Sequence, residues 1–245
     1  MVVVTERSTT RRTENAMDLI LVGGLWLDGT AWDQVVPALA EHGCRGIPVT
    51  LPGQGDGAVR ATLEDQVSAV LSAVDAVAAA GGRPWVVGHS AACTLAWIAA
   101  DRRPEQVAGV VLIGGFPSAD GEAYADFFPV VDGAMAFPGW EPFEGPDSAD
   151  LDQAARDRLA AAAVPVPEGV SRGTVRLSDD RRHGIPVVLV CPEFSPADAR
   201  AWIDAGDVPE LASATSVEFV DIDSGHWPMF TRPAELARIL ADVAN

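Results

Sequence analysis

The sequence is dominated by a regular alternation of short apolar runs with longer segments whose apolar residues recur at helical spacing. The runs that we interpret as strands lie at residues 18–22, 44–51, 84–87, 107–113, 185–190 and 216–222. The segments that we interpret as helices lie at residues 32–39, 62–77, 90–100 and 233–243. Strands that alternate with helices in this way form parallel βαβ crossovers. The sequence therefore predicts an α/β fold with a mostly parallel central sheet flanked by helices.

The length and the charge limit the partners that we expect. A chain of 245 residues is compatible with one α/β domain, since such domains often reach ~200–250 residues. The 35 acidic and 17 basic residues give a net charge of −18, which repels nucleic-acid phosphates and anionic lipids. No apolar stretch approaches the ~18 residues that span a bilayer. We therefore expect a small-molecule substrate, and neither nucleic acid nor a membrane as partner.

The first residues differ from the rest in composition. After the apolar residues 2–4, residues 5–15 are polar and include three arginines, so the continuous apolar segment of a signal peptide is missing. We expect residues 1–16 to form a flexible tail and Met17 to begin a folded domain at residues 17–245. The expected compartment is the cytoplasm.

Three cysteines, Cys44, Cys93 and Cys191, are far apart in the sequence and form no Cys-x-x-Cys pair. Their number and spacing do not fit a disulfide framework or a zinc site. We expect Cys93 and Cys191 to be small core residues. The sequence indicates neither a metal nor an organic cofactor.

The regular alternation breaks down between Phe116 and His183. This segment is rich in proline, aspartate and glutamate, and only residues 151–163 have a clear helical pattern. Large aromatic residues are interleaved in it, among them Phe127, Phe128, Phe137, Trp140 and Phe143. Long irregular connections in compact domains are often lids or binding loops. We expect a lid at about residues 116–183, and the alternative is a loose surface excursion.

The predicted strand at 84–87 leads directly into Gly88-His89-Ser90-Ala91-Ala92 and then into a helix. A Gly-x-Ser-x-small sequence between a strand and a helix places the serine on a tight turn at the edge of the sheet, because only small residues let the two elements approach. Ala92 replaces the glycine that is usual at the last position. We interpret Ser90 as a nucleophile, and the alternative is a serine that only caps the helix.

A nucleophilic serine needs a base, because its hydroxyl is barely ionised at neutral pH. The sequence has four histidines: His42, His89, His183 and His226. His226 lies in a glycine-containing loop between the last strand and the last helix, at the sheet edge where Ser90 is expected. We predict that His226 is the base, and the alternative is an exposed loop histidine. His89, inside the turn, is expected to pack or to form a hydrogen bond.

Together these segments resemble the α/β-hydrolases, and in particular the small plant-esterase and hydroxynitrile-lyase-like branch and its bacterial relatives. The resemblance is carried by residues 21–26 with Trp32, and by residues 51–56, 88–92 and 225–228. It extends from Asp18 to the C-terminus and is weakest across the segment 116–183. The resemblance implies an α/β-hydrolase fold and a serine–histidine–acid triad.

The resemblance also implies an oxyanion hole formed by the backbone N–H groups of Leu25 and Ala91. The family usually has a histidine where this sequence has Gly23, but a backbone donor does not depend on that side chain. The acid of the triad usually follows the strand at 185–190. Counted from that strand, the usual aspartate position falls near Ser195, and a shorter loop brings Glu193 into place. Glu193 is the favoured acid, and Asp198 and Asp120 remain alternatives.

The residues near these loops, most of them aromatic, indicate the chemical class of the substrate. The residues expected to bind it are Gly24, Trp26, Phe127, Phe128, Trp140 and Trp227. We expect a small apolar or aromatic ester, thioester or lactone that is hydrolysed through an acyl-enzyme intermediate. Two alternatives stay open. One is a lyase or other non-hydrolytic enzyme with the same triad, although the sequence contains no lysine to favour it. The other is a non-catalytic ligand-binding homologue.

Overall fold

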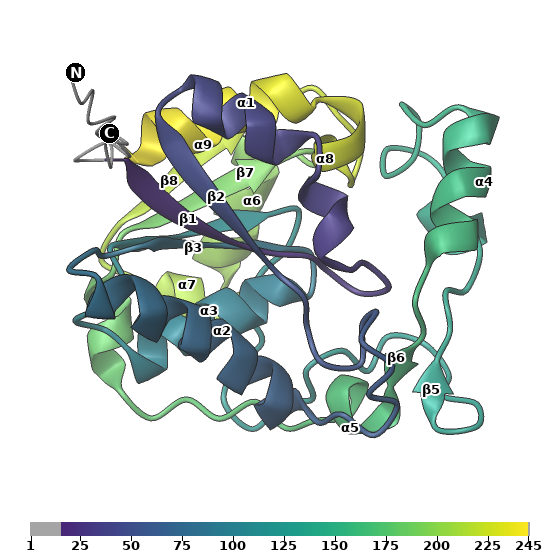
Figure 1. Cartoon of the computed structure of the whole chain (residues 1–245), viewed down its shortest axis with the longest axis horizontal. Coiled ribbons are helices and arrows are strands. Elements are labelled where there is room, and N and C mark those ends of the chain that lie inside the picture. The colour runs from purple at the N-terminus through teal and green to yellow at the C-terminus, as the bar shows by residue number, and fades with distance from the viewer. Residues whose placement is uncertain (1–15, 245) are drawn as a thin grey trace, which may run out of the picture.

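The computed structural model describes residues 16–244, and a six-stranded sheet lies at the centre of this part of the chain (Figure 1). The strands are β1 (Met17–Val22), β2 (Cys44–Val49), β3 (Trp85–His89), β4 (Gly109–Ile113), β7 (Val187–Cys191) and β8 (Val217–Asp221). Their order is β2-β1-β3-β4-β7-β8, and all neighbouring pairs are parallel. The predicted parallel sheet is confirmed.

Helices cover both faces of the sheet, as predicted (Figure 1). One face packs against α1 (Val35–Glu41) and α9 (Pro233–Ala244), and the other against α2 (Leu63–Ala79) and α3 (Ala92–Arg102). Each strand contributes to both of these packed faces, because its successive side chains point to opposite sides of the sheet. Helices α6 (Pro196–Ala205), α7 (Pro209–Ala212) and α8 (Pro228–Thr231) complete this part. Within residues 16–244, no helix is both long and apolar enough to cross a membrane.

Some predicted boundaries are wrong. The predicted helix at 32–39 is divided, because Trp32 ends a separate 3-10 helix, η1 (Gly29–Trp32), before α1 begins. The strand expected at 107–113 begins only at Gly109, since the Val107 N–H donates to the Arg103 carbonyl at the end of the preceding helix. Met17 begins β1, as predicted. The predicted tail lies outside the described residues, except for residue 16.

We call residues 116–183 the insertion, and it contains ordered short elements. Strands β5 (Ala134–Met135) and β6 (Val166–Pro167) pair antiparallel. The helices are η2 (Glu141–Phe143), α4 (Gln153–Ala162), α5 (Glu168–Ser171) and η3 (Asp180–Gly184), of which the last extends to the residue after the insertion. Figure 1 shows α4, β5 and β6 beside the sheet, on the side toward which the strands run. The segment is therefore not a loose excursion, and its role as a lid stays a prediction.

A buried charged cluster attaches the end of the insertion to the domain. The Arg182 Nε donates to Glu210 Oε2 at 3.0 Å, and the Trp97 Nε1 donates to the same oxygen at 2.9 Å. Arg182 also lies 3.3 Å from Asp101 Oδ1, and all three charged residues are less than 9% exposed. Burial acts to raise the pKa of Glu210, but the hydrogen bonds from Trp97 and Arg182 outweigh it and lower that pKa.

The substitution Glu210→Gln tests this attachment. A lowered folded-state pKa means that the charged Glu210 stabilises the fold above the pKa of the unfolded state, and that this stabilisation is lost as the pH falls through the folded-state pKa. We expect the free energy of unfolding at pH 7 to fall by about 1–3 kcal/mol, with a smaller difference from wild type near pH 4. Urea unfolding of the wild type and the variant at both pH values measures this difference in the free energy of unfolding. Glu105→Gln, at an exposed ion pair, is the control and should change stability by less than about 0.5 kcal/mol.

The turn between β3 and α3 is closely packed. A Cβ atom on Gly88 would lie 2.3 Å from the Ala92 carbonyl oxygen. On the other side of the turn, a Cβ on Gly115 would lie 2.6 Å from the Ser90 carbonyl oxygen. The glycines at positions 88 and 115 are therefore required by the close approach of the backbone around Ser90.

We expect Gly88→Ala to lower the free energy of unfolding by about 2–3 kcal/mol, because the added methyl group must displace backbone atoms of α3. Gly184→Ala is a matched control, since a Cβ there meets no atom within 4 Å and should change stability by less than about 0.5 kcal/mol. Urea unfolding compares the two variants. Equal stabilities would show that the strand and helix can separate at no cost.

Candidate active site

Ser90 lies in a strained backbone conformation at the edge of the sheet. It follows the last residue of β3 and has a φ of +55°, in the left-handed region that residues with a side chain rarely adopt. Its N–H donates to the Ile113 carbonyl at the end of β4, at 2.8 Å. Such conformations persist only where the surroundings fix them, and they concentrate at functional sites.

The parallel register brings three further loops to the same edge. In the sheet, Val22 of β1 pairs with Gly88, Gly88 with Leu112, and Leu112 with Leu189 of β7. The strands therefore end at nearly the same level. The segments that follow β1, β3, β7 and β8 carry Leu25, Ser90, Glu193 and His226, respectively.

The side chains of Ser90, His226 and Glu193 form one hydrogen-bonded chain. The Ser90 Oγ lies 2.9 Å from His226 Nε2, and His226 Nδ1 lies 2.7 Å from Glu193 Oε1. The His226 and Glu193 side chains are only 13% and 14% exposed. With a proton on Nδ1, the imidazole donates to the carboxylate, and its Nε2 is free to accept from the serine hydroxyl.

The structure places the two alternative acids elsewhere. The Asp198 carboxylate closes the capping box of α6 with Ser195, and Asp120 Oδ1 accepts a hydrogen bond from the Leu177 N–H at 2.9 Å. Of the three carboxylates considered, only Glu193 contacts His226.

His89 forms a hydrogen bond, as predicted, and its partner is the backbone of His226. Its Nε2–H donates to the His226 carbonyl at 2.7 Å. Burial and the neighbouring His226 lower the pKa of His89 to about 3, so the imidazole is neutral. His89 therefore serves as a hydrogen-bond donor to the His226 loop and adds no charge beside it.

The loop after β1 lies directly against the serine. A Cβ atom on Gly24 would lie 2.9 Å from Ser90 Cβ, and Gln54 Nε2 donates to the carbonyls of Gly24 and Leu27 at 2.9 and 2.7 Å. Within residues 16–244, no protein atom accepts from the N–H groups of Leu25 or Ala91. Sequence reasoning missed the support from Gln54, although it lies in the motif at 51–56.

Aromatic side chains surround the serine. A cavity of about 50 Å³ is lined by Leu25, Trp26, His89, Ser90, Phe127, Phe128, Phe143, His226 and Trp227. A second, of about 20 Å³, shares Leu25, Trp26 and Trp227 with it and adds Leu27, Phe137, Trp140, Leu159 and Ala163. We call the two cavities together the aromatic chamber.

The predicted substrate-binding residues occupy different places in this chamber. Trp26, Phe128 and Trp227 line it, Phe127 is 62% exposed at its rim, and Trp140 borders only the second cavity. Gly24 packs behind the serine and is not among the lining residues.

Two acidic residues of the insertion, Asp147 and Asp150, lie beside the His226 loop, and no sequence pattern indicated either of them. The His226 N–H donates to the Asp147 carbonyl at 2.8 Å, and the Gly225 N–H donates to Asp150 Oδ2 at 2.9 Å. Burial and the neighbouring Glu193 charge raise the pKa of the Asp147 carboxyl. In a chain with 35 acidic residues, nothing in the local sequence distinguishes these two.

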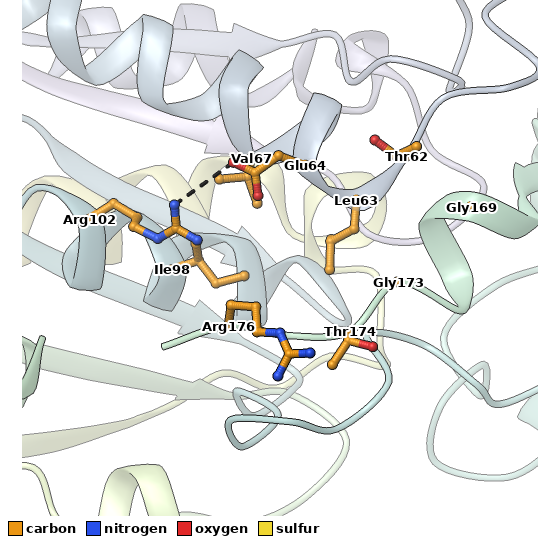
Figure 2. A pocket seen from close by; sticks show the side chains of 10 residues that line it. All are labelled: Thr62, Leu63, Glu64, Val67, Ile98, Arg102, Gly169, Gly173, Thr174 and Arg176. Carbon is orange, nitrogen blue, oxygen red and sulfur yellow. Dashed lines mark ion pairs between the residues drawn. The ribbon is translucent and has the colours of Figure 1, made fainter. Parts of the chain in front are cut away.

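Other candidate groups are unsuited to the chemistry. Burial raises the pKa of Cys93, and it raises that of Cys191 to about 12, so neither thiol is a ready nucleophile. Figure 2 shows a cavity of about 180 Å³ at the start of α2, where Arg102 pairs with Glu64 at 3.8 Å. Its lining contains none of the residues of the Ser90 site. Among residues 16–244, no cluster of His, Cys, Asp and Glu could hold a metal ion.

Comparisons with known proteins agree with this architecture. The model of the alpha/beta hydrolase family matches residues 19–239. The chain is 30% identical over 271 residues to a pyrethroid hydrolase of Sphingobium wenxiniae, with 93% of this chain and 88% of that protein covered.

Solved structures share the fold at lower identity. One is an extracellular alpha/beta-hydrolase from a Paenibacillus species, described as sharing structural and functional homology with tobacco salicylic acid binding protein 2 (TM-score 0.74, 17% identity, 92% of this chain and 98% of that one). Another is a variant of tomato methylketone synthase I (TM-score 0.70, 15% identity, 94% and 98%). The family match covers most of the chain, and the identity to the pyrethroid hydrolase extends over nearly all of it. The chain therefore belongs to the alpha/beta hydrolase family.

Proposed function

We propose that this hydrolase cleaves small, uncharged apolar or aromatic carboxylic esters, thioesters or lactones by serine catalysis. The observation that carries the proposal is the hydrogen-bonded chain from Ser90 Oγ through His226 to Glu193, with distances of 2.9 and 2.7 Å. A nucleophile that contacts a base, which is itself oriented by a third group, is the arrangement needed to activate a hydroxyl.

In the proposed reaction, Ser90 Oγ attacks the acyl carbonyl while His226 Nε2 takes its proton. The resulting imidazolium is stabilised by Glu193, which also keeps the proton of the resting imidazole on Nδ1. His226 then protonates the leaving alcohol or thiol, and an acyl-enzyme remains. Water, activated by the same imidazole, attacks the acyl carbon and releases the acid.

In this proposal, two backbone N–H groups bind the oxyanion. Leu25 and Ala91 flank Ser90, and within the described part of the chain neither N–H is used by a protein acceptor. Donors held ready for a developing negative charge contribute about 2.7–4 kcal/mol each to the stabilisation of a tetrahedral intermediate. The glycine at position 23, where the family usually has histidine, leaves these donors unaffected.

The chamber supports a neutral substrate. Apart from the imidazoles of His89 and His226, its lining carries no ionisable side chain, and His89 is neutral. Aromatic rings bind apolar and aromatic groups, but they supply no counter-charge for an anionic acyl group. The relative named a pyrethroid hydrolase makes a pyrethroid one substrate to test. Because the cavity at Ser90 is only about 50 Å³, a bulky ester would require the insertion to move.

The lyase alternative has no specific observation in its favour. The likeness to methylketone synthase I, at 15% identity, shows the fold alone, and the sequence contains no lysine that could act as an additional acid or base in the site.

Substitution of the triad tests the serine mechanism. Ser90→Ala should abolish labelling by a fluorophosphonate probe and lower kcat for p-nitrophenyl acetate by about 10⁴-fold or more. Glu193→Gln should lower kcat by about 10²–10⁴-fold, because an amide can donate to Nδ1 and so favour the wrong imidazole tautomer. Asp198→Asn is the matched control and should retain wild-type kcat. Labelling that persists in Ser90→Ala would refute the assignment of the nucleophile.

A second prediction concerns the size of the acyl group. The Phe128 ring packs against Trp26 and Phe143, with centroid distances of 5.6 and 6.0 Å, at the cavity beside Ser90. We expect Phe128→Ala to raise kcat/KM for p-nitrophenyl benzoate relative to the acetate by about tenfold, because removing the ring enlarges the site. Val131→Ala, at an exposed position of the insertion, should leave the ratio unchanged. An unchanged ratio in Phe128→Ala would place the acyl group elsewhere.

A further inference from the structure

The His226 loop is held from outside the sheet by the insertion. The loop runs from the end of β8 at Asp221 to the start of α8 at Pro228. Two consecutive N–H groups in it, those of Gly225 and His226, both donate to residues of the insertion. The His226 carbonyl is held by His89. The direction of the His226 side chain is thus determined by a backbone that is hydrogen-bonded on two sides.

The contact is close enough to exclude any side chain at position 225. A Cβ atom on Gly225 would lie 2.3 Å from the Asp147 carbonyl oxygen and 2.5 Å from Asp150 Oδ1. The insertion therefore lies directly on the loop, with no room for an intervening layer. The glycine before the histidine is required by this approach.

The part of the insertion that makes this contact is itself rigid. We call residues 147–151 the strap. Ser148 is fully buried and its hydroxyl donates to the Phe143 carbonyl at 2.7 Å. Arg156 of α4 donates to the carbonyls of Ser148 and Leu151 at 2.8 and 3.2 Å. Leu151 packs in the core with Ile222 and Trp227. These contacts hold the strap independently of its hydrogen bonds to the loop.

Asp150 is the strap residue whose side chain contacts the His226 loop. Its Oδ2 accepts from the Gly225 N–H, whereas Oδ1 is buried and has no hydrogen-bond partner among the described residues. A carboxylate placed with one oxygen unsatisfied is costly for stability. The position of the Asp150 carboxylate is therefore better explained by its hydrogen bond to the His226 loop than by a contribution to the stability of the fold.

We infer that Asp150 is a positioning residue, which holds the Gly225–His226 backbone so that the imidazole stays in contact with Ser90. This inference rests on the proposed function. It assigns the insertion a part in catalysis that is separate from substrate binding, since Asp150 is not among the residues that line the aromatic chamber.

The experiment compares three variants of the full chain. Asp150→Ala removes the acceptor and should lower kcat for p-nitrophenyl acetate by about 10- to 100-fold, with KM little changed, because small misplacements of a reacting group are costly. Asp150→Asn retains an acceptor oxygen and should recover kcat to within about threefold of wild type. Asp152→Ala is the matched control. Its carboxylate caps α4 through the Ala155 N–H at 2.7 Å, so its loss should lower Tm but leave kcat unchanged.

The outcomes separate this inference from the proposed function. If the wild type neither turns over esters nor reacts with the fluorophosphonate, the proposed function fails. If the wild type is active and Asp150→Ala keeps its kcat, or if Asp152→Ala loses kcat equally, the positioning role is refuted. A crystal structure of Asp150→Ala needs no turnover: the inference predicts that His226 Nε2 moves out of hydrogen-bond distance of Ser90 Oγ. Persistence of the 2.9 Å contact would overturn the inference.

Discussion

The close approach of backbone segments around Ser90 is the constraint on which the rest of the site depends. The serine is held at a φ of +55° between the end of β3 and the start of α3, and Gly24, Gly88 and Gly115 leave no room for a Cβ atom around it. The parallel register then determines which loops can reach it, because β1, β7 and β8 end at the same edge. The position of Ser90 is thus set by sterics, and the positions of His226 and Glu193 are set by the topology of the sheet.

Much of this arrangement could be predicted from the sequence, for definable reasons. Buried parallel strands are continuously apolar, so all six were found, and the pattern of glycine and small residues around Ser90 is local. The contact of His226 with Ser90 was expected because its glycine-containing loop lies at the same sheet edge, and Glu193 was favoured because the resemblance places an acid after β7. The errors are at the ends of elements, where local backbone hydrogen bonds decide the boundary. Trp32 was assigned to the helix on periodicity alone, and Val107 to a strand although its N–H is bonded to the preceding helix.

Hydrogen bonds between segments far apart in the sequence were beyond the reach of sequence patterns. Gln54 donates to two backbone carbonyls, and Asp150 accepts from one backbone N–H. All of these backbone groups are far away in the sequence. Such pairs leave no periodicity or spacing. The aromatic residues of the insertion were predicted as a group from their apolar character, but which of them line the chamber depends on how β5, β6 and α4 are arranged.

The placement of the insertion on the His226 loop has a consequence for how substrate preference can change in this scaffold. Because the Asp147 carbonyl and the Asp150 carboxylate accept from the loop, the segment that shapes the chamber cannot be exchanged as an independent module. An insertion grafted from another hydrolase would have to supply its own acceptors for these two N–H groups. Its backbone would also have to pass the loop without a steric clash at Gly225. Recombination at this site is therefore constrained by hydrogen-bond compatibility as well as by the shape of the new pocket.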